Sequence, residues 1–404
     1  MKQHLLTEHR PYEADLPQAV VDEISTRYSK QLEIRYGGSK DKWILAPASF
    51  VGTIRIADHE FLIRPKVPLK NLLALMDVEV ASENWQREVV GLSNDADLLA
   101  VMARLFCVAC ESATRRGVRR SYVSQKERLV APRGRIDIRE IVRSPGTLSP
   151  LPCVFDEHTA NNRLNQILRA GLRRARRVPA LGASWQRRLL MQIAELDGVD
   201  DVAQGDWSWV DRWEPDPMEQ HYATAVRLAH MLLVGSSLQS SFGDAEANTF
   251  LLNMNSLFEA WVGRRLVEHC RAHEIIEQDK LDLDRDGFVK MKPDIVARSR
   301  EGQVVAVADC KYKKLAPDGD GKNPDYYQAL AYATAYGLDE AWLIYARLPG
   351  DAESKDVVVR NVGVSLRTFG VDLSGSIDSA IAQLRDFGDR ITEYSLQKAT
   401  GSAL

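Results

Sequence analysis

The chain has 404 residues, of which 45% are hydrophobic and 27% are charged, with a formal net charge of −3. This composition indicates a globular protein with substantial cores, and the length predicts two or three domains. No apolar run approaches the roughly 20 residues of a membrane span, the N-terminal stretch lacks the apolar segment of a secretion signal, and five cysteines do not suggest a disulfide framework, so we expect a cytoplasmic protein without a membrane partner.

Residues 1–100 are expected to form a small β-rich unit. LEIRY and WILA read as a hairpin around GGSKDK, and FVGTIRIA and FLIRPKV read as a second hairpin around DHE. GGSK lacks the G-x-x-x-x-G-K-[ST] spacing of a phosphate loop, and no other segment of the sequence matches that spacing. We therefore expect this chain to bind no nucleotide itself, so that another subunit would supply any NTPase.

Residues 101–243 are expected to form a basic and mainly helical middle region. A helix is predicted from about Asp97 to Ala113, and it contains a CxxC pair, Cys107 and Cys110. A redox or metal site is one interpretation, but the apolar flanks favour two small buried side chains. From Arg115 to Arg143, ten Lys and Arg residues then face only three Asp and Glu residues.

The next predicted helix, about Asn161 to Val178, combines an apolar stripe with a basic ridge. The stripe is formed by Leu164, Ile167, Leu168, Leu172 and Ala175. A solvated basic face is one interpretation, and a track for nucleic-acid phosphates is the other. The candidates for nucleic-acid contact are Arg115, Arg116, Arg119, Arg120, Arg133, Arg135, Arg169, Arg173, Arg176 and Arg177.

Residues 197–219 reverse the charge, with eight Asp and Glu residues against one Arg. Trp207, Trp209 and Trp213 lie among these acids, which favours aromatic packing in an irregular connector over stacking on nucleobases. A helix is expected at about Met218–Leu238, and the Ser- and Gly-rich break after it places the main domain boundary near residue 243.

Residues 244–404 are expected to form an α/β domain with a mixed sheet. A helix at about Ala247–His273 carries Glu259 among apolar neighbours, and a helix at about Pro324–Gly337 carries Gln328 and Tyr332 one turn apart. Strands are predicted between these helices and at AWLIYA and VVVRNVGV, before a final helix from about Ser376.

The stretch Lys292–Tyr312 carries the clearest chemistry. Its apolar runs IVA and VVAVA flank the turn SREG, and a two-residue loop at Glu301–Gly302 would place Asp294 opposite Asp309. Strand alternation would put Asp309 and Lys311 on one face and Cys310 on the other. Because two facing carboxylates repel each other, this arrangement predicts a divalent metal with oxygen ligands, Mg²⁺ or Mn²⁺.

Two alternatives bear on this stretch. Asp282, Asp284 and Asp286 match the first half of a calcium loop, but its twelfth position is Pro293 in place of Glu, so we interpret the segment as a hairpin turn. The acids and the lysine could also form a surface salt bridge. Their combination with Glu259 and the downstream helix favours metal-assisted phosphodiester hydrolysis instead.

KPDIVARSREGQVVAVADCKY resembles the core of the PD-(D/E)XK nucleases, with Asp in place of the commoner Glu before the lysine. Gln328-ALA-Tyr332 resembles the QxxxY motif of the RecB-like branch, and Glu259 in NSLFEAWV matches the acid of that branch's N-terminal helix. Together with NMNSLFEAWV, the segments VGTIRIADHEFLIRPKV and CVFDEHTANNRLNQIL resemble the McrC family, the nuclease subunits of McrBC-type modification-dependent restriction systems.

This resemblance implies an endonuclease that acts on DNA carrying modified bases and works with a McrB-like AAA+ GTPase hexamer. The implied catalytic residues are Asp294, Asp309, Lys311, Glu259, Gln328 and Tyr332. The implied ligands of Mg²⁺ or Mn²⁺ are Asp294, Asp309, Glu259 and the backbone carbonyl of Cys310. The β-rich unit would dock on the partner and stimulate its GTP hydrolysis. The alternatives are a non-cleaving adaptor that activates a partner NTPase, and a related nuclease acting on RNA or in DNA repair.

Overall fold

The computed structural model describes residues 2–39, 41–76, 98–143, 149–178, 181–202, 205–237, 249–270, 273–313, 323–347 and 356–401. The chain divides into two compact units, one joining Met1–Val80 to Leu251–Leu404 and the other formed by Ala81–Phe250. Within the described ranges, no helix combines the length and the apolar character needed to cross a membrane.

The N-terminal part of the first unit is built on two small sheets. One has four strands in the order β1 (Lys2–Thr7), β6 (His59–Arg64), β5 (Phe50–Ile56) and β10 (Phe250–Asn253). The other has three, in the order β2 (Tyr12–Asp15), β4 (Lys42–Pro47) and β3 (Leu32–Tyr36). Helix α1 (Gln18–Arg27) contributes Val20 and Ile24 to the hydrophobic core that it shares with these strands. Helix α2 (Leu69–Leu75) follows β6. Both predicted hairpins, β3–β4 and β5–β6, are confirmed.

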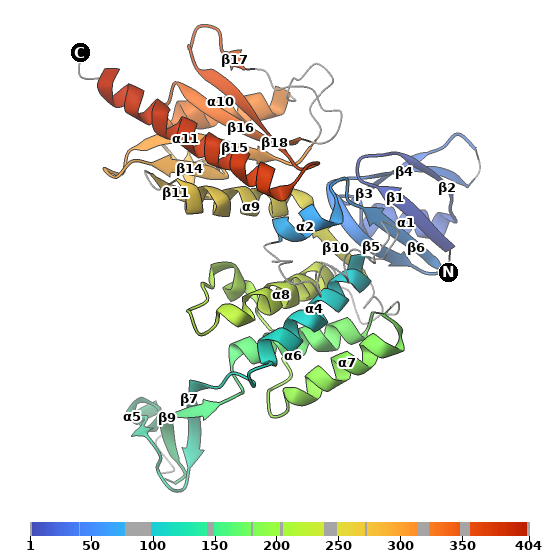
Figure 1. Ribbon diagram of the computed structural model, residues 1–404, viewed down its shortest axis with the longest axis vertical. Coiled ribbons are helices and arrows are strands. Elements are labelled where there is room, and N and C mark those ends of the chain that lie inside the picture. The colour runs from blue at the N-terminus through green and yellow to red at the C-terminus, as the bar shows by residue number, and fades with distance from the viewer. Residues whose placement is uncertain are drawn as a thin grey trace. The chain divides into compact units, whose positions relative to one another are not determined.

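The C-terminal part of the first unit is a six-stranded mixed sheet between helices. The strand order is β11 (Glu274–Glu277), β14 (Ile295–Arg298), β15 (Val304–Lys311), β16 (Glu340–Arg347), β18 (Ser365–Asp372) and β17 (Val357–Val358). The middle strands β15, β16 and β18 are parallel, and the others pair antiparallel. Helix α10 (Asn323–Tyr336) covers one face, and α9 (Met254–His269) and α11 (Ile377–Gly401) pack together on the other (Figure 1). The predicted mixed α/β architecture is confirmed.

The second unit combines a group of helices with a β arm. The helical elements are α4 (Leu98–Thr114), α6 (Arg163–Arg176), α7 (Gly182–Glu195), α8 (Ala223–Ser237) and the short 3-10 turns η2 (Ser208–Arg212) and η3 (Gln220–Tyr222). The arm consists of β7 (Ser121–Leu129), β8 (Arg135–Ile136), α5 (Ile138–Arg143) and β9 (Leu151–Thr159), and it extends away from these helices (Figure 1). The predicted apolar stripe of α6 is buried as expected.

Two expectations about these elements change. The helix expected over Ala247–His273 begins only at Met254, because the apolar run before it forms β10 beside β5 and Asn253 caps the helix by accepting from Asn255 and Ser256. The expected boundary at residue 100 falls inside α4, and the one at residues 243 and 244 lies outside the described residues. Residues 1–80 and 251–404, expected as separate regions, share one compact unit.

Candidate active site

Asp294 and Asp309 face each other because of the way β14 and β15 pair. Ile295 lies opposite Ala308, so the next position along the same antiparallel register places Asp294 opposite Asp309. The Asp294 carboxylate accepts a hydrogen bond from the backbone N–H of Cys310 at 2.7 Å. This bond fixes the Asp294 side chain across the end of β15, and we call Asp294 and Asp309 the acid pair.

The predicted register is right at the acid pair, but the predicted loop is wrong. Ser299 donates its N–H to the carbonyl of Gln303 at 2.8 Å, so the loop is one residue longer than Glu301–Gly302. The pairing then shifts between Ala297 and Arg298, where the ladder contains a bulge. Because a bulge adds one unpaired residue to one strand, it restores the register that the longer loop displaces.

A chain of polar side chains joins the acid pair to helix α10. Lys311 forms an ion pair with Asp309, and its ammonium donates to the Gln328 side-chain carbonyl at 2.9 Å. The Gln328 amide donates to the Tyr332 hydroxyl at 2.7 Å, and that hydroxyl donates to the Lys292 carbonyl at 3.2 Å. The predicted set Asp309, Lys311, Gln328 and Tyr332 is therefore brought together, with one hydrogen bond or ion pair between each neighbouring pair.

Burial and mutual repulsion shift the titration of the acid pair. Burial, and then the charge of Asp309, raise the pKa of Asp294 to about 8. Burial also raises the pKa of Asp309, although Lys311 opposes this shift. For Lys311, burial lowers the pKa, but the carboxylate of Asp309 outweighs it and the net direction is upward. Lys311 alone does not offset the two carboxylates, and a further cation there would stabilise both of them.

Glu259 lies near the acid pair but does not join it. Its carboxylate accepts from the Gln278 amide at 2.6 Å, while its charge contributes to the raised pKa of both Asp294 and Asp309. Within the described part of the chain, no three His, Cys, Asp or Glu residues are close enough to hold one metal ion. The acid pair offers the oxygen donors that Mg²⁺ prefers, and Lys311 is the one cation bonded to it among the described residues, so it fits such an ion. The roles of Glu259 and the Cys310 carbonyl as further ligands stay predictions.

Sequence reasoning missed a second buried carboxylate beside this site. Asp325 of α10 is 5% exposed, pairs with Lys313, and accepts from the Tyr345 hydroxyl at 2.9 Å. Its charge also contributes to the raised pKa of Lys311. Two signals in the sequence point to this group: Lys313 continues the alternation of Asp309 and Lys311, and Asp325 precedes Gln328 by one helical turn.

The calcium-loop-like segment at Asp282–Asp286 and the Cys107–Cys110 pair have structural roles. Asp284 accepts backbone N–H bonds from Phe288 at 3.1 Å and Val289 at 2.7 Å, as a hairpin turn between β12 (Leu281–Asp282) and β13 (Lys290–Met291) requires. Cys107 and Cys110 are buried, reduced thiols in α4, and burial raises the pKa of Cys110 well above its usual value. Both predictions are confirmed.

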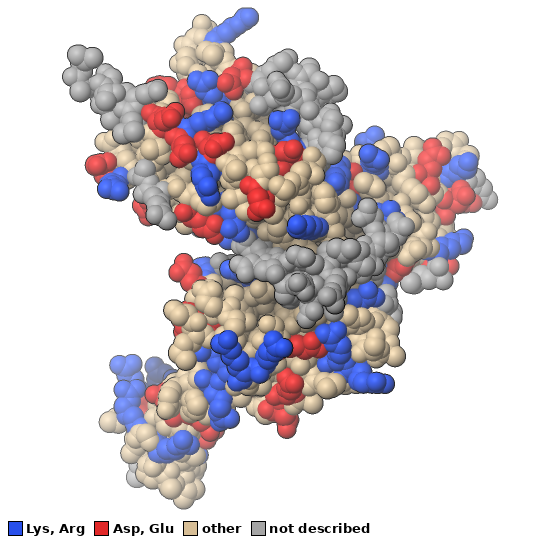
Figure 2. All heavy atoms as spheres, viewed as in Figure 1, with Lys and Arg blue, Asp and Glu red and all other residues tan. Residues whose placement is uncertain are grey.

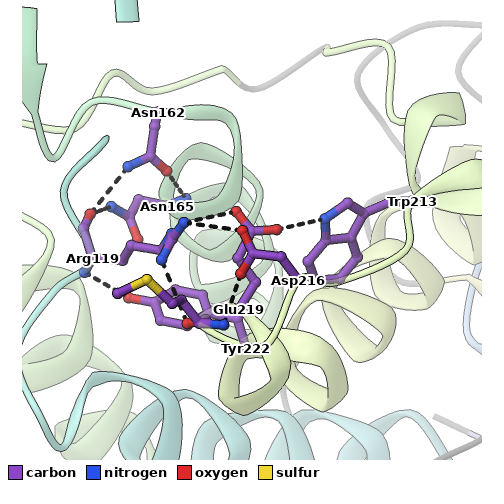
Figure 3. Close-up of polar contacts among 8 residues, drawn as sticks. Arg119, Asn162, Asn165, Trp213, Asp216, Glu219 and Tyr222 are labelled. Carbon is purple, nitrogen blue, oxygen red and sulfur yellow. Dashed lines mark hydrogen bonds and ion pairs between the residues drawn. The ribbon is translucent and has the colours of Figure 1, made fainter. Parts of the chain in front are cut away.

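Arg119, expected to contact nucleic acid, is held by an internal network at the base of the arm (Figure 3). Its guanidinium pairs with Glu219 at 3.1 Å and with Asp216 at 3.7 Å. Its backbone N–H donates to the Tyr222 hydroxyl at 3.0 Å, and its carbonyl accepts from Asn165 at 2.8 Å. These bonds join the start of β7 to α6 and η3, which favours a structural role for Arg119.

Three of the other basic candidates make contacts within the chain, and most of the candidates have exposed side chains. Arg169 donates to the Leu196 carbonyl, Arg173 pairs with Asp201, and Arg133 lies over the Phe155 ring at 4.4 Å. The candidates with exposed side chains are Arg115, Arg116, Arg120, Arg133, Arg135, Arg173, Arg176 and Arg177. Figure 2 shows Lys and Arg side chains gathered over the helices and the arm of the second unit. Nucleic-acid contact by these residues stays a prediction.

Similar proteins are found among known families and solved structures. A family model described as "McrBC 5-methylcytosine restriction system component" matches residues 45–346. A chain in the refined half-complex from a tetradecameric assembly of Thermococcus gammatolerans McrB AAA+ hexamers with bound McrC is similar in fold, with a TM-score of 0.60, 18% identity, and coverage of 96% of this chain and 100% of that chain. A chain of the T. gammatolerans McrBC complex gives a TM-score of 0.41 at 19% identity, covering 66% of this chain and 88% of that one. No curated protein matches the chain.

Proposed function

The chain belongs to the family of McrBC 5-methylcytosine restriction system components, and from this premise we propose that it is the DNA-cleaving subunit of such a system. The supporting observation is the acid pair, Asp294 opposite Asp309, with Lys311 linked to Gln328 of α10. In this proposal the mixed sheet and its helices are a PD-(D/E)XK nuclease domain of the RecB-like branch.

The proposed reaction is hydrolysis of a phosphodiester bond. A Mg²⁺ or Mn²⁺ ion held by Asp294 and Asp309, with Glu259 and the Cys310 carbonyl as further ligands, would polarise the phosphate and make water a stronger nucleophile. Lys311 keeps its positive charge at neutral pH despite burial, because the Asp309 carboxylate raises its pKa, so its ammonium can stabilise the charge that develops on the phosphate. Gln328 and Tyr332 hold that ammonium in place, which reduces the reorganisation needed during reaction.

The proposed partner is an AAA+ GTPase hexamer that recognises modified DNA. Support comes from the similar fold in an assembly of T. gammatolerans McrB AAA+ hexamers with bound McrC. It also comes from the sequence, which contains no phosphate loop of its own. In this arrangement the partner would supply GTP hydrolysis and base recognition, and this chain would supply the cleavage chemistry.

The test is cleavage of DNA containing 5-methylcytosine by the chain with its partner, GTP and Mg²⁺. Asp309→Ala and Lys311→Ala are expected to reduce the cleavage rate by about a hundredfold or more, because each removes a charged group from the reacting centre. Asp282→Asn is the matched control, since it removes a carboxylate from the exposed hairpin beside the site. It should leave cleavage unchanged.

The contrary outcomes separate the alternatives. Unchanged cleavage by Asp309→Ala and Lys311→Ala would place the active site elsewhere. Stimulation of the partner's GTP hydrolysis without any cleavage by the wild-type chain would support the adaptor. Faster cleavage of RNA than of methylated DNA would support a nuclease of another pathway.

A further inference from the structure

Tyr312, the residue after Lys311, joins the end of β15 to the N-terminal sheet. Its side chain lies on the opposite face of the strand from Lys311 and is 2% exposed. Its hydroxyl donates to the Glu8 carboxylate at 3.1 Å, and the same carboxylate oxygen accepts from the backbone N–H of Lys66 at 3.3 Å. A buried acid that follows β1 thus holds the residue next to the candidate catalytic lysine.

Ser49, between β4 and β5, makes a second connection to the same place. Its hydroxyl donates to the Tyr312 carbonyl at 3.3 Å. The Ser49 hydroxyl oxygen also lies 3.2 Å from the His9 ring nitrogen, and a proton on that nitrogen satisfies both contacts. The Ser49 carbonyl accepts from the N–H of Met254 at 2.9 Å, the first residue of α9. Ser49 therefore holds the end of β15 and the start of the helix that carries Glu259.

Burying the Glu8 carboxyl group costs folding free energy, which a connection that only stabilised the fold would not require. Glu8 is 0% exposed, and one oxygen of its carboxylate has no hydrogen-bond partner within the described residues. Apolar side chains of similar shape in place of both Glu8 and Tyr312 could join the two elements at little or no cost in stability. What an apolar residue cannot do is fix the position of the Tyr312 hydroxyl.

Resting on the proposed nuclease function, we propose that Glu8 and Ser49 are positioning residues of the cleavage site. They hold the end of β15 and the start of α9, and through these elements they set where Lys311 and Glu259 lie relative to the acid pair. The N-terminal sheet is then part of the nuclease, and its residues contribute to metal binding and to the rate of cleavage. A displacement of about 1 Å at a reacting group can change a rate by a hundredfold.

The test uses the full chain and variants of this network. Tyr312→Phe and Ser49→Ala are expected to weaken Mn²⁺ binding, measured by calorimetry without DNA or partner, and to lower kcat for cleavage by about tenfold. Glu8→Leu should have the effect of Tyr312→Phe on Mn²⁺ binding and kcat, and the double variant should be no worse than either single variant, because both changes remove the bond between Tyr312 and Glu8. Glu8→Gln keeps an acceptor for the Tyr312 hydroxyl and should retain the Mn²⁺ affinity and the kcat of wild-type.

Glu60→Gln is the matched control. Glu60 is a buried acid of the same N-terminal sheet, where it accepts from Arg55 at 2.6 Å and Gln3 at 3.1 Å. Its loss should lower the melting temperature as much as Glu8→Leu does, while Mn²⁺ affinity and kcat stay at wild-type values. A general loss of stability would instead affect all of these variants alike.

The outcomes distinguish the two proposals. If wild-type cleaves, Asp309→Ala does not, and Tyr312→Phe, Ser49→Ala and Glu8→Leu match Glu60→Gln in Mn²⁺ affinity and kcat, the positioning role is wrong and the nuclease function stands. If wild-type does not cleave, the nuclease function is wrong, and Mn²⁺ affinity alone decides the positioning role. Weaker Mn²⁺ binding in Glu8→Gln equal to that in Glu8→Leu would also overturn the role of the Tyr312 bond.

Discussion

At the scale of single residues, the first unit contains carboxyl groups whose burial changes their chemistry. Asp294 and Asp309 face each other, and Lys311 pairs with Asp309 while it also donates to Gln328 of α10. A further cation would therefore stabilise the two carboxylates. Glu8 is different, because its neighbours are a tyrosine hydroxyl and a backbone N–H. A buried acid without a cation bonded to it makes the stability of the fold depend on pH.

We predict that Glu8 lowers the stability of the protein as the pH rises through neutrality. Burial raises the pKa of Glu8 from 4.5 to about 7 in the folded chain, although contacts with Lys66 and Tyr312 oppose the shift. The folded state therefore binds this proton more tightly than the unfolded state. Stability associated with the protonated acid is complete below pH 4.5 and is lost as the pH rises to about 7. The loss should be at most about 3 kcal/mol.

The measurement compares wild-type with Glu8→Gln in urea unfolding at several pH values. Because the acid pair titrates in both proteins, the difference between the two stability curves isolates the contribution of Glu8. Above pH 7 the variant should be the more stable protein, and near pH 4.5 its advantage should vanish. A difference that does not vary across this range would show that Glu8 does not titrate there.

At the scale of elements, helix α6 carries arginines that bond to other parts of the second unit and arginines at its C-terminal end that are exposed. The buried stripe fixes its orientation, and Arg169 and Arg173 are engaged by the Leu196 carbonyl and by Asp201. Arg176 and Arg177 at its C-terminal end are exposed. Positive charge at this end of a helix is also favoured by the helix dipole, so the pattern alone does not establish a nucleic-acid surface.

We predict that Arg176→Gln with Arg177→Gln weakens DNA binding in a salt-dependent way. Each arginine that neutralises a phosphate contributes about 0.9 to the slope of log K against log salt, so the double variant should flatten that slope by about 2. Fluorescence anisotropy with duplex DNA at several salt concentrations measures it. Arg169→Gln is the control, and it should lower the melting temperature more and the slope less. An unchanged slope in the double variant would identify a solvated basic face.

The same elements show what sequence could predict. The two-residue loop predicted from the sequence placed Asp294 opposite Asp309, and this placement is correct although the loop itself is wrong. A longer turn and a bulge displace the register by one residue each in opposite senses, and neither changes the apolar pattern of the two strands, so the sequence does not reveal them. The contact of Arg119 with Glu219 was not predictable, because it joins segments far apart in the chain.

At the scale of the whole molecule, the order of the chain and the order of the fold differ. The first unit is made from both ends of the chain, and the second is inserted between them. Strand β10 completes the N-terminal sheet and leads directly into α9. The Asn71 side chain donates to the carbonyls of Leu373 and Gly375, each at 2.8 Å. Composition predicted the two ends of the chain as separate regions, because composition changes along the sequence and contains no information on contacts between distant segments.

We predict that residues 251–404 do not form a stable protein without residues 1–80. Alone, they would leave Leu251 of β10 without its core and the Met254 N–H without the Ser49 carbonyl. A chain in which a flexible linker of roughly 20 residues replaces residues 81–248 should unfold in one cooperative transition and bind Mn²⁺ as the full chain does. Calorimetry of both truncated forms measures this. Equal melting temperatures for the isolated C-terminal segment and the linked form would show that the N-terminal sheet is dispensable for folding.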